Sequence, residues 1–340
     1  MADKKKIIFR ADGNSNIGLG HVIRSLALAE MLKNDFDCIF ETRFLMDYIH
    51  TEARKVCADV VKLPESDEHF DAFLSILSGD EIVVLDNYFF DTDYQRAIKN
   101  RGCKLVCIDD MHDKHFVADV VVNHAPGAEK GQYSVEPYTQ LCLGLEYVLL
   151  RKLFREEIDT TSNFVTGKPK RIFICFGGAD YTNLSQKTIS ILLQIPDIEK
   201  IFVIIGNVNK NKENLNNSFK DNDIVSIFSD LSPKKMISII KKSDLAIVPS
   251  SSVLLEIFSI GRPVITGFYV KNQKEAFDFS VQNDLALGVN MSSENYQVLL
   301  YDIFTTCINE NICNQMITQQ KKMIKNAESL YSKIFQNLIV

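Results

Sequence analysis

The sequence predicts an α/β protein built on two open, mainly parallel sheets, because two series of short apolar strands alternate with helical stretches. A length of 340 residues is enough for two such units. In the first series we expect strands at 7–10, 38–40, 81–86, 104–108 and 117–122, and helices at 21–33 and 93–100. In the second series we expect strands at 171–176, 201–205, 224–228, 244–248 and 263–266.

A polar stretch rich in turn formers separates the two series. Residues 159–170 read Asp-Thr-Thr-Ser-Asn-Phe-Val-Thr-Gly-Lys-Pro-Lys, which is typical of a linker. We therefore predict an N-terminal domain at 1–155 and a C-terminal domain at 168–310. Residues 311–340 have apolar side chains at helical spacing, so we expect a helical tail that packs back across the first domain.

Composition excludes several classes of protein. The net charge is -6 and the basic residues are scattered, so we expect no nucleic-acid partner. No apolar run approaches the roughly 18 residues of a membrane span, so we expect no stable membrane insertion. The eight cysteines form no C-x-x-C pair and are typical of a reduced, cytoplasmic protein. The loop 109–115 holds two histidines and three aspartates without a metal-ligand spacing, so we predict a polar loop and no metal or other cofactor.

The most informative segment is a glycine-rich loop between the first expected strand and the first expected helix. Gly18 and Gly20 permit close approach of the backbone to a ligand, and His21 and Arg24 follow on the helix. Open α/β sheets bind ligands at the carboxyl ends of their strands, where a helix N-terminus favours anions. A neutral imidazole at that position can act as a general base. The alternative is a plain turn in which His21 is a helix cap.

Three serines after the strand at 244–248 open another helix. Their hydroxyl groups and the free N–H groups of a helix N-terminus suit a diphosphate, and a carboxylate one turn later can accept hydrogen bonds from a ribose. The alternative is a set of capping serines with a solvated glutamate. Two side-chain amides further on could face a sugar. These candidate binding residues are Ser250, Ser251, Ser252, Glu256, Asn272 and Gln273.

Two further strand ends carry polar or small residues. Asp86 and Tyr88 follow the strongest strand of the first series, and we expect them on the same side as His21. The alternative for Asp86 is a cap of the next helix. In the second series Gly177, Gly178 and Asp180 follow the first strand, and we expect them to approach the ligand closely.

The order of these motifs resembles a known family. Phe-Arg-Ala-Asp-Gly at 9–13 and Ile-Gly-Leu-Gly-His-Val-Ile-Arg at 17–24 are similar to the opening of the UDP-2,4-diacetamido-2,4,6-trideoxy-β-L-altropyranose hydrolases of pseudaminic acid biosynthesis. The resemblance continues to about residue 290, through 86–88, 109–110, 150–151, 177–180 and 269–273. This chain departs from the family in its extra C-terminal helical tail and in Lys-Leu-Phe after Arg151, where many members carry two acidic residues before the phenylalanine.

The resemblance implies a GT-B fold, with two Rossmann-like domains, a central cleft and no metal cofactor. It implies that His21 is the catalytic histidine, that Tyr88 and Asn272 face the sugar, and that Glu256 holds the ribose. We expect His21, assisted by Asp86 and Tyr88, to activate a water that inverts the anomeric carbon of a UDP-sugar. The rivals are a glycosyltransferase with a sugar or lipid acceptor and a non-enzymatic sensor of sugar nucleotides. We expect a monomer or a dimer.

Overall fold

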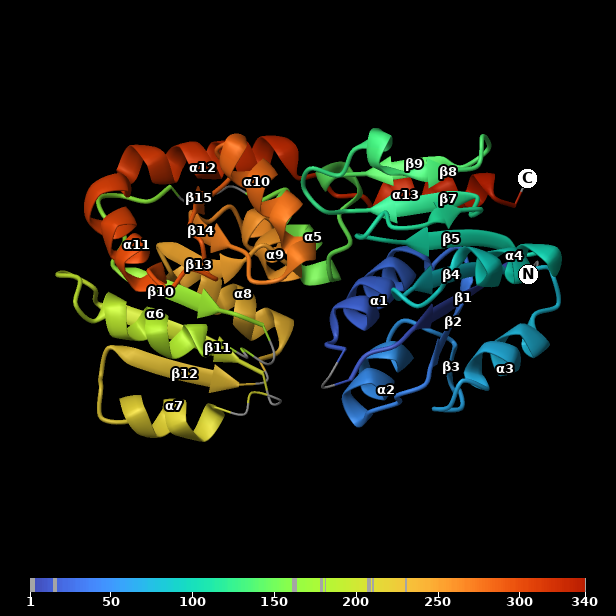
Figure 1. Ribbon diagram of the computed structural model, residues 1–340, viewed down its shortest axis with the longest axis horizontal. Coiled ribbons are helices and arrows are strands. Elements are labelled where there is room, and N and C mark those ends of the chain that lie inside the picture. The colour runs from blue at the N-terminus through green and yellow to red at the C-terminus, as the bar shows by residue number, and fades with distance from the viewer. Residues whose placement is uncertain are drawn as a thin grey trace. The chain divides into compact units, whose positions relative to one another are not determined.

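The computed structural model describes residues 4–14, 17–160, 164–177, 180, 182–206, 209, 211–229 and 231–339. Its chain separates into two compact units, one formed by Met1–Lys152 with Asn326–Val340 and the other by Leu153–Lys325. Each unit is built on its own parallel sheet (Figure 1). The predicted α/β class with two parallel sheets is therefore confirmed.

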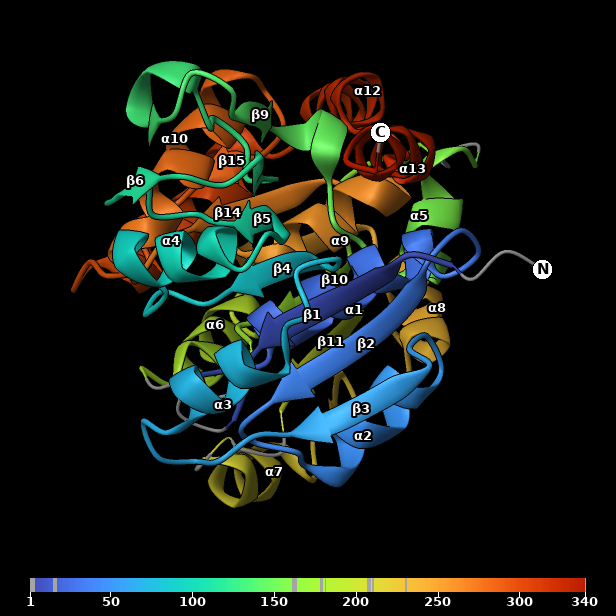
Figure 2. The same cartoon turned by 90° about the vertical axis from the view of Figure 1, so that its right-hand side faces the viewer.

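The first unit contains a seven-stranded sheet in the order β3-β2-β1-β4-β5-β7-β9, in which every neighbouring pair is parallel. Figure 2 shows β1, β2 and β3 side by side in this sheet. The strands are β1 (Lys6–Ala11), β2 (Asp37–Thr42), β3 (Asp59–Lys62), β4 (Ile82–Asp86), β5 (Lys104–Ile108), β7 (Val120–Asn123) and β9 (Gln140–Leu143). A separate short pair is formed by β6 (His115–Phe116) and β8 (Ser134–Val135). The strand expected at 117–122 forms only in its second half, as β7, because residues 117–119 lie in no strand.

Helices cover both faces of this sheet. One core cluster joins alternate residues of β1, such as Ile7 and Phe9, to the first, second and last helices of the unit. The opposite cluster joins Ile8 of the same strand to the third and fourth helices. The alternation follows from the two-residue period of a strand. These helices are α1 (Gly20–Leu32), α2 (Asp47–Arg54), α3 (His69–Ile76), α4 (Thr92–Asn100) and α13 (Glu328–Asn337).

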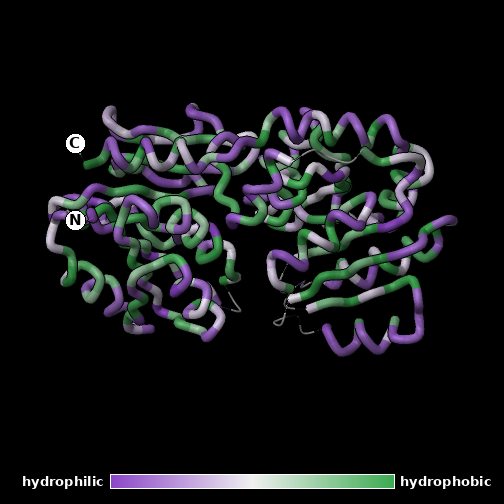
Figure 3. Tube along the Cα trace, turned by 180° about the vertical axis from the view of Figure 1, so that it is seen from behind, coloured by the Kyte–Doolittle hydropathy of each residue, from purple (hydrophilic) through white to green (hydrophobic). Residues whose placement is uncertain are grey.

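The second unit repeats the plan with six parallel strands in the order β12-β11-β10-β13-β14-β15. In Figure 3 the hydrophobic colouring follows the strands, whereas the outer helices carry much of the hydrophilic colouring. The strands are β10 (Arg171–Cys175), β11 (Lys200–Ile205), β12 (Val225–Ser229), β13 (Leu245–Pro249), β14 (Val264–Gly267) and β15 (Leu287–Gly288). The helices are α5 (Lys152–Ile158), α6 (Leu184–Leu192), α7 (Lys212–Phe219), α8 (Pro233–Lys242), α9 (Ser252–Ile260), α10 (Lys274–Gln282), α11 (Tyr296–Asp302) and α12 (Glu310–Met323).

The C-terminal segment forms two helices that belong to different units. The residues of α12 pack into the core of the second unit, as the buried Cys313 and Met316 show. The residues of α13 pack against α1, and the Tyr331 hydroxyl donates to the Tyr147 carbonyl at 2.6 Å. The segment predicted as one tail at 311–340 is therefore divided between the two units. Its last part lies on the first unit because α13 buries Phe335 there.

Bilayer crossing requires a helix that is both long and apolar, and none of the helices in the described ranges meets this requirement. Seven cysteines are buried as free thiols, and Cys307 is exposed.

Replacing Phe335 by alanine tests the attachment of α13. The ring is fully buried and meets Phe36 edge-on at 6.2 Å, so Phe335→Ala leaves a cavity and should lower the free energy of unfolding by about 3–5 kcal/mol. Urea unfolding followed by circular dichroism measures the change. In the control Ile339→Ala, the side chain is 45% exposed, and the expected change is below about 0.5 kcal/mol. Equal effects of the two substitutions would contradict this packing.

Candidate functional site

The candidate site of the first unit lies where the strand order of the sheet reverses. Strands β2 and β3 extend to one side of β1, whereas β4 and β5 extend to the other. The connections leaving β1 and β4 therefore diverge at their carboxyl ends, which is where open α/β sheets bind ligands. His21 lies in the first turn of α1, after β1, and Asp86 is the last residue of β4. The fold thus brings these two predicted residues together across 65 positions of sequence.

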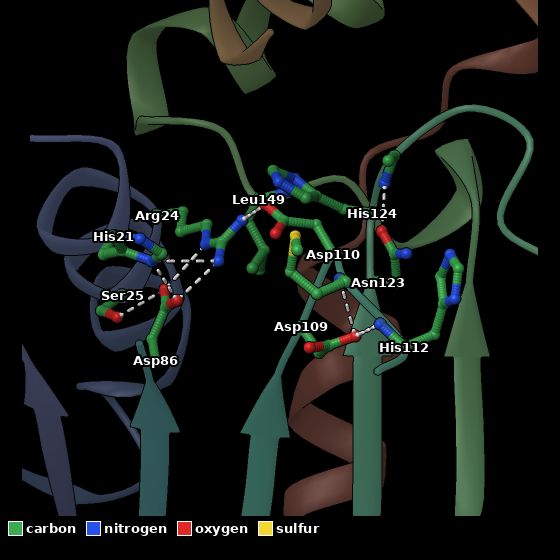
Figure 4. A network of polar contacts seen from close by, with 12 residues as sticks. His21, Arg24, Ser25, Asp86, Asp109, Asp110, His112, Asn123, His124 and Leu149 are labelled. Carbon is green, nitrogen blue, oxygen red and sulfur yellow. Dashed lines mark hydrogen bonds and ion pairs between the residues drawn. The ribbon is translucent and has the colours of Figure 1, made fainter. Parts of the chain in front are cut away.

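The carboxylate of Asp86 is the centre of this site, and three side chains from α1 converge on it (Figure 4). Arg24 binds it through two atoms, with Nε donating to Oδ2 at 2.8 Å and Nη2 donating to Oδ1 at 2.6 Å. The Ser25 hydroxyl donates to Oδ2 at 3.1 Å, and His21 Nδ1 lies 2.7 Å from Oδ1. Asp86 is completely buried, so these donors replace its hydration.

The charge of Asp86 determines which nitrogen of His21 carries the proton. Burial raises the pKa of Asp86, but Arg24 and His21 lower it to about 2, so the carboxylate is ionised and can only accept. His21 Nδ1 must therefore donate to it. Arg24 Nη2 lies 3.1 Å from the same Nδ1 and donates to Asp86 instead. In the neutral imidazole the lone pair is then on Nε2, for which the described residues supply no hydrogen-bond partner.

Arg24 connects Asp86 to a second carboxylate. Its Nη1 donates to Asp110 Oδ2 at 2.8 Å, so the guanidinium is shared between two acids. Burial lowers the pKa of Arg24, but Asp86 and Asp110 raise it well above its usual value. Burial raises the pKa of Asp110, but the nearby Arg24 has the opposite effect, and the pKa lies below its usual value. Arg24, predicted as a ligand-binding residue, is only 6% exposed, and its printed hydrogen bonds hold the two carboxylates.

Tyr88 and His124 complete this group. The Tyr88 ring meets the His21 ring edge-on with centroids 4.7 Å apart, and it is 44% exposed. Partial burial and the Asp110 carboxylate raise the pKa of Tyr88, so its hydroxyl is a donor at neutral pH. His124 is buried, and its Nδ1 accepts the Leu149 N–H at 3.1 Å. Burial and Arg24 lower the pKa of His124 to about 4, which leaves the ring neutral.

Sequence reasoning missed His124 and assigned Asp110 to an ordinary polar loop. The available signal was position, because Asn123 ends β7 and Asp109 follows β5, at the same edge of the sheet as Asp86. The neighbouring Asp109 holds the turn of this loop after β5. Both Met111 and His112 donate their backbone N–H groups to Asp109 Oδ2, at 3.0 and 2.7 Å.

The glycine-rich loop closes on itself before α1 begins. The Gly18 N–H donates to the Asn14 carbonyl at 2.8 Å, and Gly18 has a φ of 84°, a conformation that favours glycine. A Cβ added at Gly18 or Gly20 would meet nothing within 4 Å, so the backbone is open there. The N-cap of α1 is Leu19, which makes no side-chain cap bond. His21 is therefore not the N-cap of α1, and its Nδ1 is bound to Asp86.

The candidate site of the second unit has the same topological position. Its strand order reverses between β10 and β13, and the serines follow β13. Ser251 is the N-cap of α9, but its side chain makes no cap hydrogen bond. The buried Ser250 hydroxyl lies 2.9 Å from the Thr266 hydroxyl. Ser252 is exposed, and its N–H has no partner among the described residues, so α9 presents a free amide at its N-terminus.

The remaining predicted residues of the second unit differ in their burial and in their hydrogen bonds. Glu256 is buried in α9, not a solvated glutamate. Asn272 is exposed, whereas the buried Gln273 accepts the Tyr269 N–H through Oε1 at 3.2 Å. The two carboxylate oxygens of Asp180 accept the N–H groups of Leu184 and Ser185, at 2.8 and 2.9 Å, so Asp180 caps α6.

Gly177 has a φ of 80°, and Gly178 lies outside the described residues. In the described ranges, no three His, Cys, Asp or Glu side chains are grouped as metal ligands would be.

Comparison with known proteins supports the resemblance that the motifs predict. The chain is 26% identical over 275 residues to the UDP-2,4-diacetamido-2,4,6-trideoxy-β-L-altropyranose hydrolase of Campylobacter jejuni, covering 79% of this chain and 93% of that enzyme. It is also 26% identical to the spore coat polysaccharide biosynthesis protein SpsG of Bacillus subtilis, covering 82% of this chain and 83% of that protein. No family model matches the chain.

An uncharacterized protein of Methanocaldococcus jannaschii, MJ1062, is similar over 86% of this chain at 26% identity. The chain spans only 61% of the length of that archaeal protein.

Solved structures share the fold over nearly the whole chain. MurG of Acinetobacter baumannii superposes with a TM-score of 0.68 at 15% identity, covering 98% of this chain and 99% of that one. HepE of Anabaena in complex with UDP superposes with a TM-score of 0.62 at 12% identity, covering 98% of each chain. These likenesses establish the fold, which is the predicted GT-B type.

Asp86→Asn tests the centre of the first site. The neutral amide leaves Arg24 without its bidentate partner, so the free energy of unfolding at pH 7 should fall by about 3 kcal/mol. Because the folded pKa of Asp86 is depressed to about 2, its contribution is present above about pH 4 and is lost as pH falls towards 2. Denaturant unfolding from pH 7 to pH 2 should show a weaker pH dependence in the variant.

Asp93→Asn is the matched control. Asp93 pairs with Arg96 on the surface and its side chain is 87% exposed, so the expected change is below about 1 kcal/mol. Wild-type stability in Asp86→Asn at pH 7 would show that the carboxylate does not organise this site.

Proposed function

We propose that the chain hydrolyses a UDP-linked diacetamido-trideoxy sugar to the free sugar and UDP, as a step in nonulosonic (pseudaminic) acid biosynthesis. The observation that carries the proposal is the His21 imidazole, whose Nδ1 lies 2.7 Å from the ionised Asp86, so that the lone pair of the neutral ring is on Nε2. The similarity to a hydrolase of such a UDP-sugar supports the choice of substrate class and reaction.

In the proposed reaction, His21 Nε2 accepts a proton from a water molecule. The water oxygen attacks the anomeric carbon as the bond from that carbon to the phosphate oxygen breaks, and UDP leaves with the electron pair. Attack on the face opposite the leaving group inverts the anomeric configuration. The proton then passes from the imidazolium to solvent. Asp86 stabilises the imidazolium and holds the ring in one tautomer, as a buried carboxylate does for other catalytic histidines.

Tyr88 and the second unit have supporting roles in this proposal. The exposed Tyr88 ring, edge-on to His21, provides a surface for the sugar. Ser250, Ser251 and the N-terminus of α9 bind the diphosphate, Glu256 binds the ribose, and Asn272 contacts the sugar. The free amide at the start of α9 favours an anion by geometry and by the helix dipole. Departing UDP is stabilised by such N–H donors.

A glycosyltransferase with the same donor is the second candidate, because the fold is shared with MurG and HepE. In that reaction a sugar or lipid hydroxyl replaces water, and His21 takes the hydroxyl proton. Incubation of the protein with the UDP-sugar and no acceptor separates the two candidates, with the products followed by NMR. Hydrolysis predicts UDP and the inverted free sugar at enzymatic rates. Persistence of the intact UDP-sugar, with turnover only after an acceptor is added, would favour the transferase.

His21→Asn tests the base. The amide cannot accept a proton as imidazole does, so kcat should fall by about a hundredfold or more. The Kd of UDP should stay within about twofold, because His21 is not among the groups proposed to hold the nucleotide. Single-turnover kinetics and calorimetry measure the two quantities. His50→Asn, an exposed histidine on α2, should leave both unchanged. Wild-type kcat with weakened UDP binding in His21→Asn would reverse the assignment.

A further inference from the structure

A second buried charge cluster lies at the same edge of the first sheet, beside the Asp86 site. Its one partly exposed member is Arg43, which directly follows β2. The Arg43 Nε donates to Asp12 Oδ2 and its backbone N–H donates to Asp12 Oδ1, both at 2.7 Å. The guanidinium lies over the Phe44 and Phe89 rings, at 5.1 and 4.8 Å from their centroids. Arg43 is therefore held in one orientation by a carboxylate and two aromatic rings.

Asp12 is shared with a second arginine. Arg10 Nη1 and Nη2 donate to the two oxygens of Asp12 at 2.7 and 3.1 Å, and both residues are completely buried. Burial raises the pKa of Asp12, but Arg10 and Arg43 lower it, so Asp12 is ionised. Two guanidinium groups thus share one carboxylate, and these three residues carry a formal charge of one positive unit.

The two buried ionisable side chains beside this cluster, His69 and Glu41, do not fully balance its charge. Arg10 Nη2 lies 3.1 Å from His69 Nδ1, and burial together with Arg10 lowers the pKa of His69 to about 4, so its ring is neutral. Glu41 pairs in register with Arg10 on the adjacent strand and is 1% exposed, yet its Oε2 has no hydrogen-bond partner. Burial raises the pKa of Glu41 to about 7. Glu41 is therefore partly protonated at neutral pH.

The outer edge of Arg43 is available to a ligand. Its hydrogen bonds to Asp12 use Nε and the backbone N–H, and the described residues provide no partner for Nη1 or Nη2. The side chain is 15% exposed, which places it between a core residue and a surface residue. A guanidinium held in this way presents two parallel N–H groups, the geometry that recognises a carboxylate or a phosphate.

We propose that Arg43 binds one oxyanion group of the ligand through its two Nη atoms, and that the ligand supplies the negative charge that the Arg10–Asp12–Arg43 cluster lacks. The oxyanion is a phosphate of the nucleotide, because a diacetamido-trideoxy sugar carries no carboxylate. An uncharged hydroxyl would fit less well, because it leaves the buried excess charge uncompensated. The inference rests on the proposed function only in taking the ligand to be a sugar nucleotide.

The first test measures binding without turnover. Calorimetry with UDP, UDP-glucose and UDP-glucuronic acid compares the wild type with Arg43→Gln. A phosphate contact predicts that the variant binds all three about tenfold or more weakly. Weaker binding of UDP-glucuronic acid alone would show a contact to a sugar carboxylate, which the proposed substrate lacks, and would overturn the assignment to phosphate. Unchanged affinity for all three ligands would overturn the proposal.

Two further variants control for structure. Arg96→Gln removes an exposed arginine that pairs with Asp93 on α4 and should bind all ligands as the wild type does. Arg43→Lys keeps the charge but not the two parallel donors, so its affinity should lie between those of the wild type and Arg43→Gln. Circular dichroism and thermal unfolding establish that each variant is folded. Wild-type affinity in Arg43→Lys together with a loss in Arg43→Gln would support a charge without bidentate geometry and overturn the assignment of both Nη atoms.

The pH dependence of binding gives a second readout. The ionisable groups facing Glu41 are Arg10 from β1, Asp59 from β3 and Tyr94 from α4. Below pH 7 protonated Glu41 leaves the cluster positive, and above pH 7 its carboxylate competes with the ligand anion. Affinity for the ligand that depends on Arg43 should therefore fall severalfold from pH 6 to pH 8, a range in which the diphosphate diester of UDP-glucose does not titrate. Glu41→Gln should remove this dependence, and identical profiles in both proteins would overturn the coupling.

The two proposals fail separately. If the wild type hydrolyses the UDP-sugar but Arg43→Gln binds its ligands with unaltered affinity, only the proposed anion site is overturned. If the wild type does not hydrolyse the UDP-sugar but Arg43→Gln clearly loses affinity for its ligands, only the proposed reaction is overturned.

Discussion

The ionised carboxylate of Asp86 is the constraint on which the first site depends. An isolated carboxylate cannot remain charged in a dry interior, so it needs donors on both oxygens. Arg24, Ser25 and His21 supply them from consecutive turns of α1. Arg24 in turn requires a second acid, which is Asp110. The tautomer of His21, and hence the position of its lone pair, follows from this arrangement of charges.

Much of the fold, and the positions of the candidate sites at the ends of strands, could be predicted from the sequence, because both are encoded locally. The apolar runs that became β1, β4, β10 and β13 are bounded by polar or glycine-rich segments, and their alternation with helices implies a parallel sheet. Ligands gather where such a sheet reverses its strand order, so residues directly after these four strands were good candidates. His21, Asp86 and the serines after β13 lie at such positions in their own units.

The detailed roles could not be predicted, because they depend on contacts between residues far apart in sequence. Arg24 was predicted to bind a ligand, but its partners in the structure are Asp86 and Asp110, which lie 62 and 86 positions away in the sequence. The position of His124 directly after β7 was the only signal in the sequence, because its neutral state results from burial and from Arg24. Conversely, Asp180, predicted to approach the ligand, uses both carboxylate oxygens to accept N–H groups of α6.

The two charge clusters of the first unit have opposite signs, and this polarity suits the proposed chemistry. Asp86 and Asp110 outnumber Arg24 in one, whereas Arg10 and Arg43 outnumber Asp12 in the other. The clusters are adjacent, because the Asp12 N–H donates to the side chain of Asn87, the residue after Asp86, at 2.7 Å. When a glycosyl phosphate bond breaks, the sugar ring and the base gain positive charge while the phosphate gains negative charge. An edge that is negative beside His21 and positive beside Arg43 favours this charge separation, which is larger in the transition state than in the ground state, where the diphosphate is already anionic.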